Sequence, residues 1–137
     1  MKLNSPTAIL SATLLALATI AGPVVAQPMA QTPLTEPVQV SGSVTPSRAS
    51  SCGLLAEGAA QILQVQDDFT SVDIAVNGSA GLTLFIQGPN GFTECHTTSG
   101  TTGSISAPGL MNQGSYSFFI GNSSAVATQY TLTLSQN

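Results

Sequence analysis

The chain has 137 residues, of which 42% are hydrophobic and 6% charged, with 2 basic against 6 acidic side chains and a net charge of −4. This length allows one compact domain. Two basic side chains cannot neutralise a run of phosphates. The composition therefore excludes a nucleic-acid-binding protein. A mean hydropathy of +0.31 also excludes an intrinsically disordered chain, which would combine low hydrophobicity with high net charge.

The first 26 residues have the layout of a secretory signal peptide. Lys2 gives a positive start, residues 8–21 are rich in Leu and Ala, and a Gly-Pro pair then breaks the apolar run. Val24 and Ala26 fit the minus-three and minus-one positions of a signal peptidase site, which places cleavage before Gln27. We therefore expect a secreted or periplasmic protein with no membrane span after cleavage. The alternative is an uncleaved membrane anchor.

Residues 27–37 contain three prolines among Gln and Thr, a composition typical of an extended, solvated linker. We expect this Pro/Gln-rich segment to be disordered and the folded domain to span residues 38–137. Removal of the signal peptide leaves Arg48 as the only strongly basic residue of the mature chain.

The domain alternates apolar and polar residues with the period of half-buried β-strands. Residues 77–81, Asn-Gly-Ser-Ala-Gly, tolerate positive φ and predict the clearest hairpin of the chain. Residues 88–91 predict a second turn, residues 96–103 a polar loop, and only residues 54–63 are compatible with a short helix. The expected strands lie around residues 38–44, 63–65, 72–76, 82–86, 116–120 and 130–134.

These short strands with Gly-rich turns, and the lack of a sustained 3.6-residue period, predict an all-β fold, an antiparallel β-sandwich of jelly-roll-like type. A domain this small has a modest core, so a covalent cross-link matters. Cys52 and Cys95 are the only cysteines, and in an exported chain we expect them to form one disulfide. Two unpaired thiols are the alternative.

Catalytic and metal-binding patterns are scarce. His96 is the only imidazole, with Glu94 two residues before it, and no Gly-x-Ser-x-Gly motif occurs, so we expect no enzyme. One His with two distant Cys cannot fill a structural zinc site. Asp67 and Asp68 are the best candidates for a calcium site, but an Asp pair at a turn is usually a solvated bend, so we predict no cofactor.

Aromatic residues are the remaining candidates for binding. Most of the 5 Phe and 2 Tyr fall on inward-facing strand positions, where core packing explains them. Phe92 and Phe119 are the exceptions, and together with His96 they are the predicted binding residues. The absence of Trp weakens the case for a glycosidase, which would also need a pair of carboxyl groups.

Five segments carry a resemblance to a known family. They are Cys-Gly at residues 52–53, the run ending in Gly-Pro-Asn-Gly at 82–91, Cys95, Gly-Ser-Tyr-Ser-Phe-Phe-Ile-Gly at 114–121, and Tyr-Thr-Leu-Thr-Leu-Ser at 130–135. In this order and spacing the chain resembles the bacterial pre-peptidase C-terminal domain and its secreted relatives. The resemblance implies a small β-sandwich and a non-catalytic accessory module that aids secretion, folding or substrate contact.

One loop departs from the pattern of that family. Relatives commonly carry an Asp pair directly after the second Cys and an Asn-Pro some residues later. Here Cys95 is followed by His96-Thr97-Thr98, and the later proline follows Ala107. The carboxylates that would hold a cation in this loop are therefore missing, and we assign no calcium site to it.

The sequence thus predicts a secreted, non-catalytic β-sandwich module that acts through contacts with a protein or a cell-surface polymer. Two alternatives stay open. The first is a small glycan-binding, lectin-like domain that uses the loop at residues 96–103 with Phe92 at its edge. The second is a homo-oligomeric envelope component that pairs exposed strand edges, since few charges guard those edges.

Overall fold

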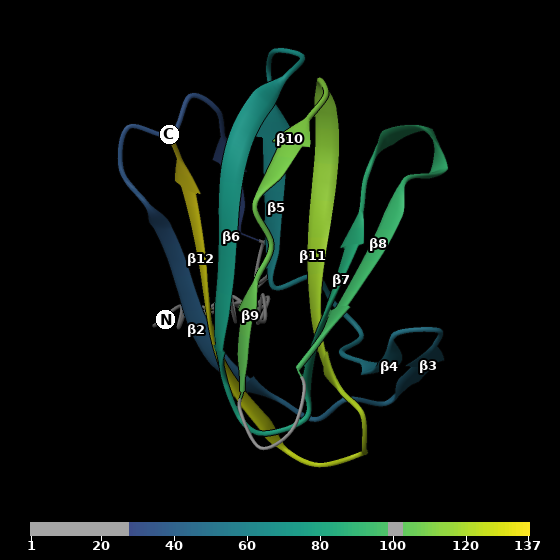
Figure 1. Ribbon diagram of the computed structural model, residues 1–137. Helices are drawn as coiled ribbons and strands as arrows, with labels where there is room; N and C mark the ends of the chain where they lie inside the picture. Colours follow the sequence, from purple (N-terminus) through teal and green to yellow (C-terminus); the bar gives the residue numbers. More distant parts are fainter. Residues whose placement is uncertain (1–27, 99–102) are drawn as a thin grey trace, which may run out of the picture.

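The computed structural model describes residues 28–98 and 103–137, so the expected signal peptide and its cleavage site lie outside the described residues. The chain folds as a sandwich of two β-sheets, as the alternating pattern predicted (Figure 1). Within the described ranges, no helix has the length and apolar character needed to cross a membrane.

The first sheet is built around strand β11 (Gly114–Asn122). One side of β11 pairs with β5 (Gln61–Val65) and then with β4 (Gly53–Leu55), and its other side pairs with β7 (Leu82–Gln87). The sheet is completed by β1 (Met29–Gln31) beside β5, β3 (Arg48–Ser50) beside β4, and β8 (Thr93–Thr97) beside β7. The β7–β8 connection contains a short 3-10 turn, η1 (Pro89–Gly91).

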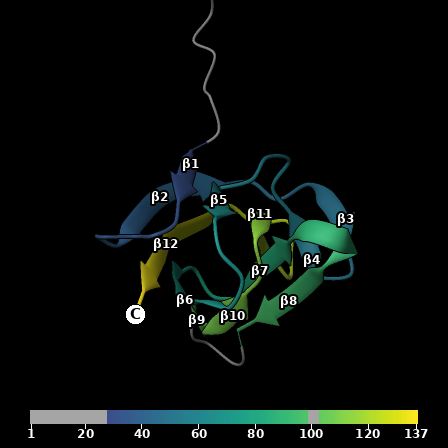
Figure 2. The same ribbon diagram turned by 90° about the horizontal axis from the view of Figure 1, so that it is seen from above.

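The second sheet has β12 (Thr128–Gln136) between β2 (Val38–Val44) and β6 (Thr70–Gly78). The far edge of β6 pairs with two short strands, β9 (Ser104–Ser106) and β10 (Gly109–Met111). Viewed from above, the strands of the two sheets surround one central core (Figure 2). Alternate residues of the long strands fill it, and the largest of them are fully buried: Leu63, Ile74, Leu82, Leu84, Ile86, Phe118, Ile120, Leu132 and Leu134.

The disulfide between Cys52 and Cys95 is present, and it lies on the outer face of the first sheet. There it joins a small second cluster in which Cys52 packs with Leu55 and Phe119. The guanidinium of Arg48 stands over the Phe119 ring, 4.8 Å from its centroid. This cluster holds the β3–β4 segment against the sheet.

The expected hairpin around residues 77–81 is wrong. Strands β6 and β7 are consecutive in the chain, but β6 lies in the second sheet and β7 in the first, so the connection passes from one sheet to the other. Val76 and Leu82 are both fully buried from opposite layers. An alternating pattern specifies which side chains face the core, and it leaves open which sheet the next strand joins.

The expected disordered linker also differs from the structure over residues 28–37. Met29–Gln31 form β1, which pairs in parallel with β5, and the backbone N–H of Thr32 donates to the carbonyl of Gln64 (2.9 Å). Leu34 packs against the core. The prolines at 28 and 33 flank the paired residues instead of interrupting them, which proline permits at the ends of an edge strand.

Two further expectations need correction. Residues 54–63 form no helix, because Leu54 and Leu55 pair with β3 and β11 before the chain bends into β5. His96 lies within β8 and not in a polar loop, since it pairs with Leu84 of β7. A Thr- and His-containing edge strand that is exposed on one face has the same polar composition as a loop.

Candidate functional site

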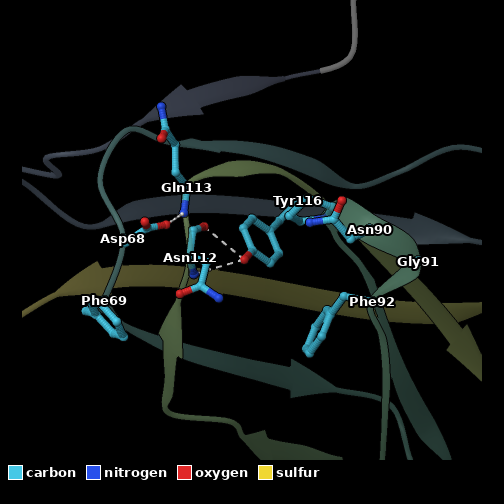
Figure 3. Close-up of a pocket in the computed structure, with 9 residues that line it drawn as sticks. Asp68, Phe69, Asn90, Gly91, Phe92, Asn112, Gln113 and Tyr116 are labelled. Atoms are coloured by element: carbon cyan, nitrogen blue, oxygen red, sulfur yellow. Dashed lines mark hydrogen bonds between the residues drawn. The ribbon is translucent and has the colours of Figure 1, made fainter.

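An open cleft of about 650 Å³ lies at the end of the sandwich that carries the β5–β6, β7–β8 and β10–β11 connections (Figures 1 and 3). Residues distant in sequence meet there because both sheets present these connections at the same end. The cleft is lined by Asp68, Phe69, Pro89, Asn90, Gly91, Phe92, Asn112, Gln113 and Tyr116.

The β5–β6 connection forms one wall of the cleft. The hydroxyl of Thr70 donates to the carbonyl of Asp67 (2.6 Å), which closes a tight bend. Asp68 accepts a hydrogen bond from the backbone N–H of Gln113 at 2.8 Å, and this bond ties the bend to the β10–β11 connection. Phe69 follows with a φ of 58° and a side chain that is 75% exposed. A bulky aromatic residue rarely adopts this left-handed conformation.

The β7–β8 turn forms the opposite wall. Its two hydrogen bonds join Gly88 N–H to the Phe92 carbonyl (2.8 Å) and Phe92 N–H to the Pro89 carbonyl (3.1 Å). Asn90 occupies the left-handed region with a φ of 57°, a conformation that Asn tolerates. The Phe92 ring is 44% exposed and stands edge-on to the Tyr116 ring, with 6.1 Å between the centroids.

Tyr116 and Asn112 form the floor between the two walls (Figure 3). The Tyr116 hydroxyl donates to the carbonyl of Asn112 (3.0 Å) and accepts from the N–H of the same residue (3.1 Å). Burial of the phenol raises the pKa of Tyr116 above its ordinary value, and the nearby Asp68 carboxylate adds to that effect. The floor is therefore uncharged at neutral pH.

The lining combines two exposed aromatic rings with polar groups that have free hydrogen-bonding capacity. Within the described residues, the side-chain amides of Asn90, Asn112 and Gln113 make no hydrogen bond. Asp68 contributes the one carboxylate, and no lining residue is basic. Such a site suits an uncharged ligand that has both an apolar face and hydroxyl groups.

The residues predicted from the sequence are distributed over several places. Phe92 and Asp68 both line the cleft, whereas Asp67 contributes its backbone carbonyl to the adjacent bend. Phe119 is only 9% exposed and lies on the outer face of the first sheet. His96 lies on β8, outside the cleft lining.

His96 forms a pair with Glu94, two residues earlier on the same strand. Its Nε2 lies 2.7 Å from Oε1 of Glu94, outside hydrogen-bond geometry, so the contact is a charge pair when the imidazole is protonated. Among residues 28–98 and 103–137, no group of three or more His, Cys, Asp or Glu residues is placed to hold a metal ion.

Sequence reasoning did not predict the other lining residues. Tyr116 follows the inward alternation of its strand, so its exposure to the cleft at the end of the core has no sequence signal. Phe69 does carry a sequence signal, because it directly follows Asp67 and Asp68 in a predicted turn, where an aromatic side chain is not expected to be buried in the core. The remaining polar lining residues, Asn90, Asn112 and Gln113, have a composition typical of turns. Only the tertiary structure shows that these turns line the same cleft.

Comparison with known proteins yields a match by structure only. No protein-family model matches the sequence, and no curated protein matches it. The pre-peptidase C-terminal domain of a collagenase from Bacillus anthracis superimposes with a TM-score of 0.52 at 12% identity, over 80% of this chain and 96% of that domain. The chain shares the fold of a pre-peptidase C-terminal domain.

The pre-peptidase C-terminal fold is therefore confirmed as a backbone arrangement, in line with the motifs at residues 82–91 and 114–121. A second solved structure is PliG from Aeromonas hydrophila, a periplasmic inhibitor of g-type lysozyme. It has a TM-score of 0.44 and 13% identity, over 82% of this chain and all of that one (100%).

Proposed function

We propose that this protein is an exported, non-catalytic module that binds a neutral polysaccharide chain in the cleft between Phe69 and Phe92. The observation that carries the proposal is the combination of a left-handed backbone and an exposed ring at Phe69. Its backbone adopts a left-handed conformation that costs an aromatic residue about 1 kcal/mol or more, while its ring gains little from packing because most of it is exposed. Strain of this kind is typical of residues held in place for binding.

Asn90 on the opposite wall provides an internal comparison. It has nearly the same φ, 57° against 58°, but it is a residue type that suits the conformation. Folding alone would favour Asn or Gly at position 69 as well. A phenyl ring at this position is therefore explained by contact with a bound ligand and not by packing within the domain.

The chemistry of the lining favours a saccharide over other polymers. The pyranose ring presents an apolar C–H face that packs on an aromatic ring, and its hydroxyl groups match amide side chains that both donate and accept. Phe69 and Phe92 offer such rings, and the free amide of Asn112 lies between them (Figure 3).

The charge of the site favours a neutral chain. Asp68 is the only charged residue in the lining, and it repels phosphate and carboxylate groups. Arg48, the one basic side chain in the described residues, stands over Phe119 on the outer face of the first sheet. Anionic polymers therefore have no counter-charge at the cleft.

Co-sedimentation with insoluble polysaccharides tests the proposal. The protein should be retained by cellulose or chitin and not by an anionic polymer such as alginate. Phe69→Asn should lower affinity about tenfold, since a stacked ring contributes roughly 1.5 kcal/mol. The same variant should unfold at an equal or higher temperature, because Asn fits the left-handed backbone.

Val126→Ala is the matched control, because it also removes exposed apolar surface but lies outside the cleft lining. It should bind like the unmodified protein. Equal retention of the Phe69 and Val126 variants would contradict the proposal. Retention only on a protein component of the cell envelope would contradict it too, and would redirect attention to a protein partner.

A further inference from the structure

A smaller pocket of about 100 Å³ opens beside the cleft and shares Phe92, Asn112 and Tyr116 with it. Its other walls come from the β9–β10 connection, β10, and Glu94 on β8. It therefore lies at the open side of the sandwich, where the edge strands of the two sheets face each other.

Gly109 produces part of the space in this pocket. It lies two residues before Met111 on β10, so both point to the same face of the strand, and Met111 is buried. A Cβ atom placed on Gly109 would meet nothing within 4 Å. Its φ does not lie in the left-handed region, so the backbone does not require glycine here.

The pocket has the size and chemistry of a small amide substituent. A water molecule takes up about 30 Å³ in the liquid, so the volume corresponds to roughly three or four heavy atoms. Ile74, Ala107 and Met111 supply apolar walls for a methyl group. Oε1 of Glu94 lies beside Nε2 of His96, so the other carboxylate oxygen, Oε2, is the one that can accept an N–H at the rim of the pocket.

We propose that this pocket receives the acetamido group of an N-acetylated sugar whose ring lies in the cleft. The methyl group packs against Ala107 and Met111, and the amide N–H donates to Glu94. A hydroxyl in place of the acetamido group leaves the pocket unfilled. The inference rests on the proposed function, and it narrows the ligand class from neutral polysaccharides to polymers of N-acetylhexosamine.

Calorimetric titration with matched tetrasaccharides tests this selectivity. The unmodified protein should bind chitotetraose about tenfold more tightly than cellotetraose, which is the order of discrimination that one small group in an apolar pocket provides. Gly109→Leu fills the pocket and should reduce the affinity for chitotetraose to that for cellotetraose, leaving cellotetraose binding unchanged. Gly109→Ala should give a smaller loss in the same direction.

Val126→Ala is the control variant, because Val126 is an exposed apolar residue that lines neither the cleft nor the side pocket. It should retain the preference for chitotetraose. Equal affinity of the unmodified protein for both tetrasaccharides would overturn the acetamido pocket and leave the saccharide cleft intact. Tighter binding of the deacetylated chitosan tetrasaccharide would also overturn it, because Glu94 would then be attracting an ammonium group. Failure to bind any of the three would overturn the cleft itself.

Discussion

Loss of the Cys52–Cys95 disulfide should destabilise the domain more than any single side chain outside the main core. The bond closes a loop with a sequence separation of 43 residues. On the chain-entropy model, closure of a loop this long lowers the free energy of the folded state relative to the unfolded state by about 4 kcal/mol. For a domain of this size each kcal/mol shifts the melting temperature by about 4 °C, so reduction should lower it by about 15 °C.

Scanning calorimetry of the native protein, with and without a phosphine reductant, measures this shift. The Cys52→Ala/Cys95→Ala variant is the control, and its melting temperature should not respond to the reductant. Cys52 is buried beside Leu55 and Phe119, so this variant also loses packing and should melt no higher than the reduced protein. A shift below about 3 °C on reduction would refute the reasoning, as would two alkylatable thiols in native material.

Three other changes have defined outcomes. Leu84→Ala should lower the free energy of unfolding by about 2–5 kcal/mol in urea titration, because Leu84 is fully buried, whereas Leu110→Ala should change it by less than about 0.5 kcal/mol. Asn122→Ala should lower it by about 3 kcal/mol, because this buried amide donates to Ala80 and Thr128 and accepts from Ser124, and a loss below about 1 kcal/mol would contradict that role. Burial raises the pKa values of Tyr116 and Tyr130 above 10.0, so both phenols ionise at lower pH in the unfolded chain, and the stability of the fold should decrease as pH rises above about 10. Tyr116→Phe should make this decrease smaller. A melting temperature that stays constant from pH 8 to 11 would contradict the predicted pH dependence.

Much of the fold follows from local patterns in the sequence. The alternation at residues 72–76, 82–86, 116–120 and 130–134 predicted strands that the structure confirms, with the expected residues facing the core. The two cysteines, together with the expected export signal, predicted the cross-link. These features depend on short-range periodicity and on chemistry that a single chain segment displays.

The pairing of strands did not follow from the sequence. Residues 77–81 have turn-forming composition whether the next strand returns to the same sheet or crosses to the other, so the expected hairpin was wrong. Met29–Gln31 looks like a polar spacer, because its pairing with β5 depends on a contact more than thirty positions away. Long-range contacts of this kind leave no local periodicity.

The candidate site was predictable only in fragments. Phe92 and Asp68 were singled out for different reasons, one as an exposed aromatic residue and the other as a cation ligand, and the structure places them in one cleft. Asn112 and Tyr116 complete it from a third connection. The strained backbone of Phe69 is the strongest indication of function in the chain, and only the three-dimensional structure contains it.

An NMR titration of the isotopically labelled protein with chitotetraose tests the central claim most directly. The account predicts that backbone amide shifts concentrate in residues 67–69, 90–92 and 109–116, around the cleft and its side pocket. The amides of Arg48 on the outer face of the first sheet and of Gly42 in the second sheet should not move. Shifts centred on either of those positions, or no shifts at millimolar ligand, would contradict it.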